Sequence, residues 1–96
     1  MNKQEQLVIE TIETILKVSH ITEKGRKRDV VDARRLAYTV FRDIYSYTYQ
    51  RIARVFNNDH ATIIFGYKSA QDLLEVDKEF RHNYNRCLDL LSGGRA

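Results

Sequence analysis

The stretch "YTYQRIARVFNNDHATIIFGYKSA", residues 47 to 70, holds two apolar segments of helical period with a short polar break between them. Thr48 is well placed as the N-cap of the first segment, because its hydroxyl can accept a hydrogen bond from a free N–H group of the first turn. The break at Asn57 and Asn58 favours a turn, since asparagine tolerates the left-handed conformation that closes a helix. The apolar positions of the short first helix are Tyr49, Ile52, Ala53 and Phe56.

The second segment starts at Asp59, which is placed to cap a longer helix with Ile63, Ile64 and Tyr67 on its inward face. A short helix, a tight turn and a longer helix form the outline of a helix-turn-helix, in which the start of the second helix enters the major groove of DNA. Many helical bundles share this outline, so it is a weak signal by itself.

The rest of the chain also predicts helices, over residues 3–18, from Arg28 or Asp29 to near Ser46, and over residues 77–91. The segment "SHITEKG" interrupts the pattern, and Gly25 allows a sharp turn there. We therefore expect an all-α fold, a small helical bundle that contains the helix-turn-helix. The residues expected to face its core are Leu7, Val8, Ile12, Ile15, Leu16, Val30, Ala33, Leu36, Ala37, Val40, Phe41, Ile44, Phe80, Tyr84, Cys87, Leu88 and Leu91.

Length and composition limit the possible functions. The chain has 96 residues, enough for one small domain. A single cysteine and three scattered histidines have no zinc-ligand spacing and match no catalytic motif, so neither an enzyme nor a metal site is expected. No cofactor is expected either. The N-terminus lacks the apolar block of a signal peptide and no segment is long enough to span a membrane, which predicts a cytoplasmic, nucleoid-associated protein without membrane partners.

Charge is concentrated in the middle of the chain, where residues 24 to 54 hold nine Lys or Arg against three Asp. A positively charged face is the electrostatic footprint of a nucleic-acid binder, although a solvated helix surface is the plain alternative. Tyr45, Tyr47 and Tyr49 offer a different possibility, stacking on single-stranded bases, against the more ordinary role of core or rim residues.

The order of residues in this stretch resembles the C-terminal DNA-binding domain, domain IV, of the bacterial replication initiator DnaA, a Trp-repressor-like helix-turn-helix. That family has an apolar-small pair, a phenylalanine, a glycine-rich turn, the run Asp-His-Thr-Thr and an apolar helix. The upstream stretch "KRDVVDARRLAYTVFRDIYSYTY" is also similar to the family, and the resemblance covers roughly residues 8 to 91. The matching residues here are Ile52, Ala53, Phe56, Asp59, His60, Ala61, Thr62, Ile63 and Ile64.

Two departures from the family pattern lie at the turn. "FNND" is one residue shorter than the family's Phe-Gly-Gly-Arg-Asp and lacks its base-reading arginine, and Ala61 replaces the first threonine. The family fuses this domain to an ATPase, whereas no phosphate-binding loop is found in this sequence and no nucleotide is expected. The chain starts with its own Met1, so we expect a free-standing module of the kind that a phage or another mobile element could encode.

The resemblance implies sequence-specific binding to A·T-rich, DnaA-box-like double-stranded DNA. Asn58, Asp59, His60, Ala61 and Thr62 are expected in the major groove, where such side chains reach base edges. Asp59 can equally be a plain N-cap. The basic arm, which we define as Arg26, Lys27 and Arg28, is expected at the minor groove. Arg34 and Arg51, with Arg35 and Arg54, are expected as phosphate contacts or solvated charges.

The expected organisation is one DNA-binding domain over residues 1–96, with an N-terminal helix in 1–22, the domain-IV-like core in 26–91 and a flexible tail in 92–96. The module would regulate replication initiation or transcription. The alternative is a protein-interaction module that binds the host initiator or another protein without reading DNA. A pure protein binder would be expected to expose an apolar patch at the start of the second helix, where this chain is polar.

Overall fold

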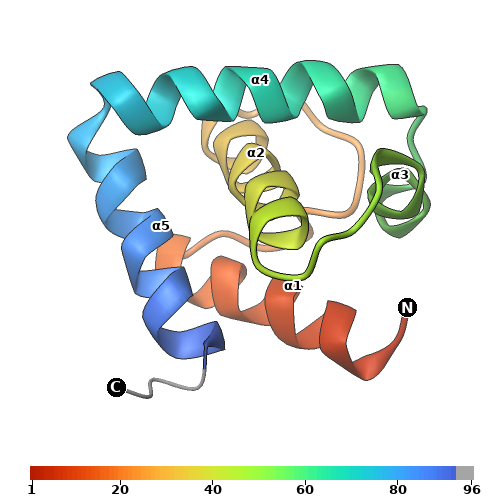
Figure 1. Cartoon of the computed structure of the whole chain (residues 1–96), viewed down its shortest axis with the longest axis horizontal. Coiled ribbons are helices and arrows are strands. Elements are labelled where there is room, and N and C mark those ends of the chain that lie inside the picture. The colour runs from red at the N-terminus through yellow and green to blue at the C-terminus, as the bar shows by residue number, and fades with distance from the viewer. Residues whose placement is uncertain (93–96) are drawn as a thin grey trace.

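The computed structural model describes residues 1–92, which form five helices (Figure 1). The all-α fold is confirmed. α2 runs through the centre of the bundle and packs against each of the other four helices. The helices are α1 (Lys3–Leu16), α2 (Arg28–Asp43), α3 (Tyr49–Phe56), α4 (His60–Val76) and α5 (Lys78–Leu91).

The central position of α2 is explained by its sequence. The run of residues 36–41 is buried without interruption, which covers every side of a helix of 3.6 residues per turn. Ala33, Leu36, Ala37, Val40 and Phe41 are buried as expected, and Tyr38 and Thr39 are buried in addition. Thr39 satisfies its hydroxyl by donating to the carbonyl oxygen of Arg35 at 3.0 Å. Val30 and Ile44, near the two ends, are only partly buried.

α1 packs against α2 and α5, so it belongs to the same core. Asn2 caps it, in a reciprocal capping box with Glu5. The Glu5 carboxylate is buried and accepts a hydrogen bond of 2.9 Å from the hydroxyl of Tyr47. The prediction was wrong for Leu7, which is exposed, because the buried stripe runs through Val8, Ile9, Ile12 and Ile15.

Three helix ends differ from the prediction. α1 stops at Leu16 rather than residue 18, because Lys17 adopts the left-handed conformation at φ 57°. α2 stops at Asp43 rather than near Ser46, which itself has a positive φ of 58°. This earlier stop lets the chain turn back so that the Tyr47 ring stacks on Phe41, with 4.9 Å between ring centroids. The last helix begins one residue later than expected, because Asp77 is its N-cap.

Two later helices are held to the end of α2 by one carboxylate. The Tyr67 hydroxyl of α4 donates to Asp43 Oδ1 at 2.8 Å, and the Tyr84 hydroxyl of α5 donates to Asp43 Oδ2 at 3.2 Å. Burial, together with the bond to Asp43 and its negative charge, raises the pKa of each tyrosine to about 12. Tyr84, Leu88 and Leu91, expected in the core, are only partly buried, whereas Phe80 and Cys87 are buried as predicted.

Within residues 1–92, no helix is long and apolar enough to cross a membrane. Of the tail predicted over residues 92–96, residues 93–96 lie outside the described part of the chain.

Candidate nucleic-acid interface

The turn between α3 and α4 has the geometry that the sequence predicted. Thr48 caps α3 by accepting the N–H of Arg51 at 3.1 Å. Asn57 adopts the left-handed conformation at φ 52°, and its N–H donates to the carbonyl oxygen of Arg54. The N–H of Asn58 reaches further back, to the carbonyl oxygen of Ala53 at 2.9 Å. The two asparagines therefore close α3 before α4 starts in a new direction.

Asp59 is the N-cap of α4, and its Oδ1 accepts the N–H of Thr62 at 2.8 Å. The carboxylate is exposed, and its pKa lies below the ordinary value because the backbone and side chain of Thr62 donate to it. Electrostatic interactions with His60 and Lys24 lower the pKa of Asp59 further. Asp59 is thus ionised at neutral pH and keeps an exposed carboxylate while it caps the helix.

The first turn of α4 points outward. His60, Ala61 and Thr62 are all exposed, while Asn58 is partly buried. The Asn58 side chain interacts with the hydroxyl of Tyr38 from α2, so it is less free to reach a base than the other four predicted major-groove residues. The exposed N–H groups of this helix end also carry partial positive charge, which suits a phosphate.

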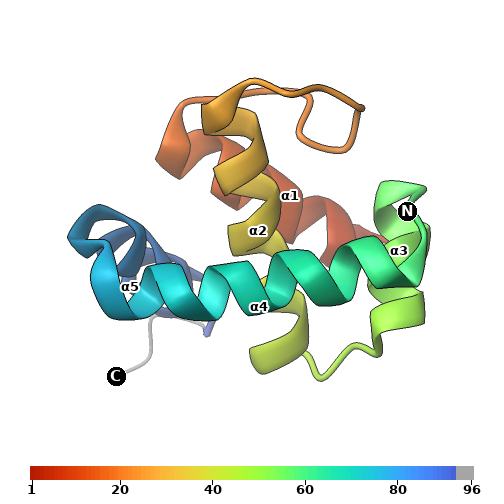
Figure 2. The ribbon, with the colours of Figure 1, turned by 90° about the horizontal axis from the view of Figure 1, so that it is seen from above.

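Tyr38 fixes the direction of α4. Its ring is 4% exposed and packs edge-on against Phe56 of α3, with 5.0 Å between centroids. A Cβ on Gly66 of α4 would lie 2.5 Å from Cε2 of the same ring, so only glycine permits this approach. Figure 2 shows α4 crossing α2 with its N-terminal end beside α3. One tyrosine therefore contacts both helices of the helix-turn-helix and the turn between them.

The predicted inward face of α4 is confirmed at Ile63 but only in part at Ile64 and Tyr67. Ile63 is fully buried, but Ile64 and Tyr67 are only partly buried. Gly66 and Ala70 complete the buried face. A small residue at each of these two positions lets α4 lie close to α2.

The basic arm lies where the connection between α1 and α2 meets α2, with Lys27 as the N-cap of α2 and Arg28 as its first residue. Arg26, Lys27 and Arg28 are exposed, and the Arg28 side chain is 83% exposed although its Nε lies 3.4 Å from Asp32. Ile21, fully buried, anchors the connection, and its N–H donates to Glu13 Oε2 at 3.1 Å. Figures 1 and 2 show this connection on the same side of the molecule as the start of α4, whose residues 59–62 we call the mouth of α4. The charge of Lys24, in the same connection, also lowers the pKa of Asp59.

Of the remaining predicted cations, Arg54 is exposed, and Arg35 lies 3.6 Å from Asp32 Oδ1. Arg34 and Arg51 are positioned by protein contacts. Arg34 is partly buried and donates to the carbonyl oxygen of Gly25 at 2.6 Å, so it holds the connection to α2. The Arg51 guanidinium lies 3.9 Å from the ring centroid of Tyr47 and 3.9 Å from Glu5 Oε2, with its side chain 48% exposed. Arg51 therefore keeps an exposed surface while it is positioned by two neighbours.

The three tyrosines considered for base stacking are not free rings. Tyr47 is buried, and Tyr45 and Tyr49 are partly buried. The Tyr49 ring is covered on one face by the Arg42 guanidinium, 4.1 Å from its centroid, and meets Tyr67 edge-on. These contacts support the core or rim role of the three residues.

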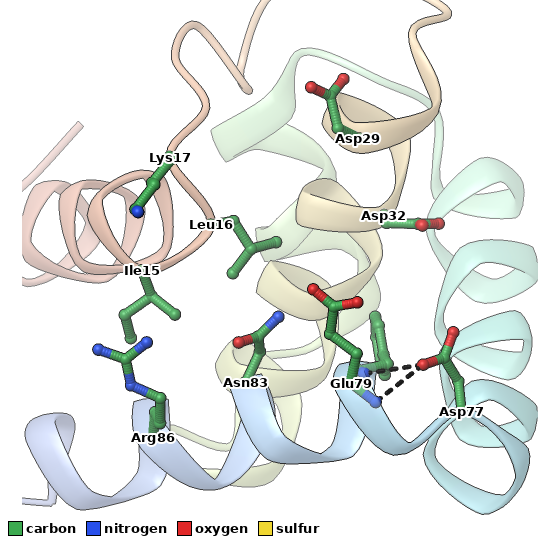
Figure 3. Close-up of a pocket in the computed structure, with 10 residues that line it drawn as sticks. Ile15, Leu16, Lys17, Asp29, Asp32, Asp77, Glu79, Asn83 and Arg86 are labelled. Carbon is green, nitrogen blue, oxygen red and sulfur yellow. Dashed lines mark hydrogen bonds between the residues drawn. The ribbon is translucent and has the colours of Figure 1, made fainter.

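A surface pocket of about 450 Å³ lies at the other end of α4, between the end of α1, the start of α2 and the start of α5 (Figure 3). Four carboxylates line it, against the two cations Lys17 and Arg86. Its excess of negative charge does not suit a phosphate. Among residues 1–92, no group of three or more His, Cys, Asp or Glu side chains is arranged to hold a metal ion.

Sequence reasoning missed Tyr38, Gly66 and Phe65. A tyrosine within an apolar helix gave no sign that it contacts both helices of the motif. Gly66 did give a signal, since an isolated glycine inside a helical pattern often marks a close helix approach. Phe65 comes directly after the residues that match the family pattern, and an apolar residue in an apolar helix gives no sign that it is exposed. Its exposed fraction is 68%.

Comparison with known proteins identifies the relatives of this chain. Residues 6–69 match the family model described as "Bacterial dnaA protein helix-turn-helix". The "Chromosomal replication initiator protein DnaA" of Bacteroides thetaiotaomicron is 35% identical over 91 residues, 84% of this chain and 19% of the relative. The proteins of the same name from Bacteroides fragilis and Thermus thermophilus are 35% and 34% identical, over 79% and 67% of this chain and 16% and 15% of their own length.

The chain thus spans less than a fifth of the length of the relatives it matches. The matched region is the C-terminal helix-turn-helix, a non-catalytic DNA-binding domain, and it contains α3, the turn and the first turns of α4. The extent of these matches, together with the five-helix fold, shows that the chain belongs to the family of C-terminal helix-turn-helix domains of the bacterial replication initiator DnaA.

Proposed function

We propose that this chain is a sequence-specific DNA-binding module that recognises initiator-box-like, A·T-rich duplex sites. The observation that carries the proposal is the position of two surfaces on one side of the molecule. The exposed, polar mouth of α4 lies on the same side of the molecule as the connection that leads into the basic arm (Figures 1 and 2). The charge of Lys24 in that connection also acts on Asp59. A recognition helix beside a basic arm suits simultaneous contact with a major groove and the adjacent minor groove.

In the major groove, base edges would be read by His60, Ala61 and Thr62. The His60 ring can hydrogen-bond, and the methyl groups of Ala61 and Thr62 suit the thymine methyl. Asp59 would cap the helix start and offer its exposed carboxylate to a cytosine amino group. Asn58, tied to Tyr38, would contribute less. The family's arginine before Asp59 is absent from this chain, so the preference for one base at one position of the DNA site would be weaker.

In the minor groove, the exposed basic arm would supply cations where A·T-rich DNA has its strongest negative potential. Arg51 would contact phosphate from its position over Tyr47. Arg34 would act mainly by holding the arm through Gly25, although it too was expected at the phosphates. Phosphate contacts give affinity and its salt dependence, whereas base contacts give specificity.

For the biological role, we propose occupation of initiator-type sites, which would regulate replication initiation, or transcription from promoters beside such sites. A cytoplasmic, nucleoid-associated location would follow. The relatives are named chromosomal replication initiators, and this proposal extends only the DNA-binding part of such a protein to the present chain. Binding to the host initiator without DNA recognition is the competing function.

The test is a pair of titrations, with an initiator-box duplex and a scrambled duplex of the same composition, at two salt concentrations. The wild type should prefer the box. His60→Ala should lose about 1–3 kcal/mol of binding on the box and much less on the scrambled duplex. His82→Ala, which removes another exposed histidine on α5, is the matched control and should bind as the wild type does.

The basic arm is tested by salt dependence. Arg26→Ala with Arg28→Ala should lower the slope of log affinity against log salt by about two. The matched control is Lys78→Ala with Arg86→Ala, which also removes two positive charges, but from exposed positions of α5. In that variant the slope of log affinity against log salt should stay largely unchanged. An equal affinity of the wild type for box and scrambled duplex would contradict the proposal, and binding to initiator protein alone would favour the competing function.

A further inference from the structure

Phe65 is the only aromatic residue among the large apolar side chains that the described chain exposes. Its side chain is 68% exposed, whereas Phe41, Phe56 and Phe80 are all buried. Phe65 takes part in none of the ring contacts found within residues 1–92, which involve other aromatic residues. Single exposed apolar residues are ordinary on a protein surface, so the position of Phe65 matters more than its exposure.

Phe65 lies on the outward side of α4, one helical turn beyond Ala61. Ile63, Gly66 and Ala70 are buried on the opposite side. Side chains on a helix lean toward its N-terminus, so the ring of Phe65 covers the surface above the first turn. It therefore adds an apolar surface to the same mouth that presents exposed Ala61 and Thr62.

We propose that Phe65 is a specificity residue that reads thymine by contact with its C5-methyl group in the major groove. The methyl is the one apolar feature that a base pair displays there, and phenylalanine is among the side chains that contact it. Cytosine at the same position lacks the methyl. This inference rests on the proposed function, since it needs α4 in the major groove, and it adds a thymine preference to the site.

The position of Phe65 also predicts where that thymine lies. One helical turn advances about 5.4 Å along the helix axis. Successive base pairs are about 3.4 Å apart. The base read by Phe65 should thus lie within about two base pairs of the one contacted by Ala61.

The experiment replaces each thymine of the initiator-box duplex in turn by deoxyuridine, which removes only the methyl group. Binding of the wild type, Phe65→Ala and Phe65→Leu is measured by fluorescence anisotropy. The wild type should lose about threefold to fivefold in affinity at one or two positions, the value of one buried methyl group. Phe65→Ala should be indifferent to deoxyuridine at those positions, and Phe65→Leu should be intermediate.

Val76→Ala is the matched control, because Val76 is 78% exposed at the far end of the same helix. It should show the wild-type response at every position. Circular dichroism should be unchanged in all variants, since both side chains are exposed. An identical deoxyuridine profile for the wild type and Phe65→Ala, with preference for the box retained, overturns the inference and leaves the proposed function standing. If the wild type does not prefer the box to the scrambled duplex, the proposed function fails and the inference fails with it.

Discussion

Replacing Gly66 by alanine tests how closely α4 lies against α2. In an unobstructed helix interior this change would stabilise the protein by about 1 kcal/mol, because alanine is the better helix former. Here the new Cβ would lie 2.5 Å from Cε2 and 2.7 Å from Cδ2 of the Tyr38 ring. The ring has little room to move, since Tyr38 is buried and packs edge-on against Phe56.

Overpacking a well-filled core costs about 1–3 kcal/mol, so the expected net effect of Gly66→Ala is a loss of about 1 kcal/mol. Urea denaturation followed by far-ultraviolet circular dichroism measures it. Gly25→Ala is the matched control, because a Cβ there meets only the end of the Arg34 side chain at 3.9 Å. That variant should be neutral or slightly more stable.

A double-mutant cycle with Tyr38→Ala separates the gain in helix propensity from the steric clash with the Tyr38 ring. Without the ring, Gly66→Ala should become stabilising, because only the gain in helix propensity remains. If Gly66→Ala raises the denaturation midpoint equally with and without the Tyr38 ring, α2 and α4 do not approach as closely as described. The contact between Tyr38 and Gly66 would then not fix the direction of α4.

Three further predictions concern the core and its titratable groups. Phe56→Ala removes a buried ring at the centre of the helix-turn-helix and should cost about 3–5 kcal/mol in the free energy of unfolding; an unchanged urea midpoint would place Phe56 outside the core. Cys87 is fully buried, and burial raises its thiol pKa to about 12, so a thiol reagent at pH 8 should modify it only when the chain opens, and immediate labelling of the native protein would contradict this. The pKa of Tyr67 and of Tyr84 is raised to about 12 from 10.0, so the folded state holds these protons more tightly than the unfolded state, and stability should be fully present below pH 10 and fall as the pH rises toward 12. Asp43→Asn should bring both tyrosine pKa values down, which absorbance titration of tyrosinate would show, and two unchanged values would argue against the shared carboxylate.

The sequence was sufficient to predict the local structure of the helix-turn-helix. Thr48, the two asparagines and Asp59 act through hydrogen bonds within a few residues, and these bonds are the same in any fold that contains the motif. For the same reason the residue types at the mouth of α4 already indicated which surface to consider for DNA.

Tertiary contacts could not be predicted in the same way. Periodicity gives one buried face per helix, but residues 36–41 of α2 are buried on every side among four neighbouring helices, so Tyr38 and Thr39 were missed. The same limit explains Leu7, whose apolar character placed it in a stripe that the packing of α1 leaves exposed. The proximity of Lys24 to Asp59 joins two segments that are distant in sequence, and no local pattern encodes it.

The contact between Tyr38 and Gly66 separates two tasks within α4. The residues that fix its position, Ile63, Gly66 and Ala70, share no position with the exposed residues of its first turns, Ala61, Thr62 and Phe65. Changes at the exposed positions should therefore alter the preferred DNA sequence with little effect on stability, because such residues lose few contacts. Under the proposed function, this division would make the chain a suitable scaffold for selecting new DNA specificities, with Tyr38 kept constant and the outward positions of α4 randomised.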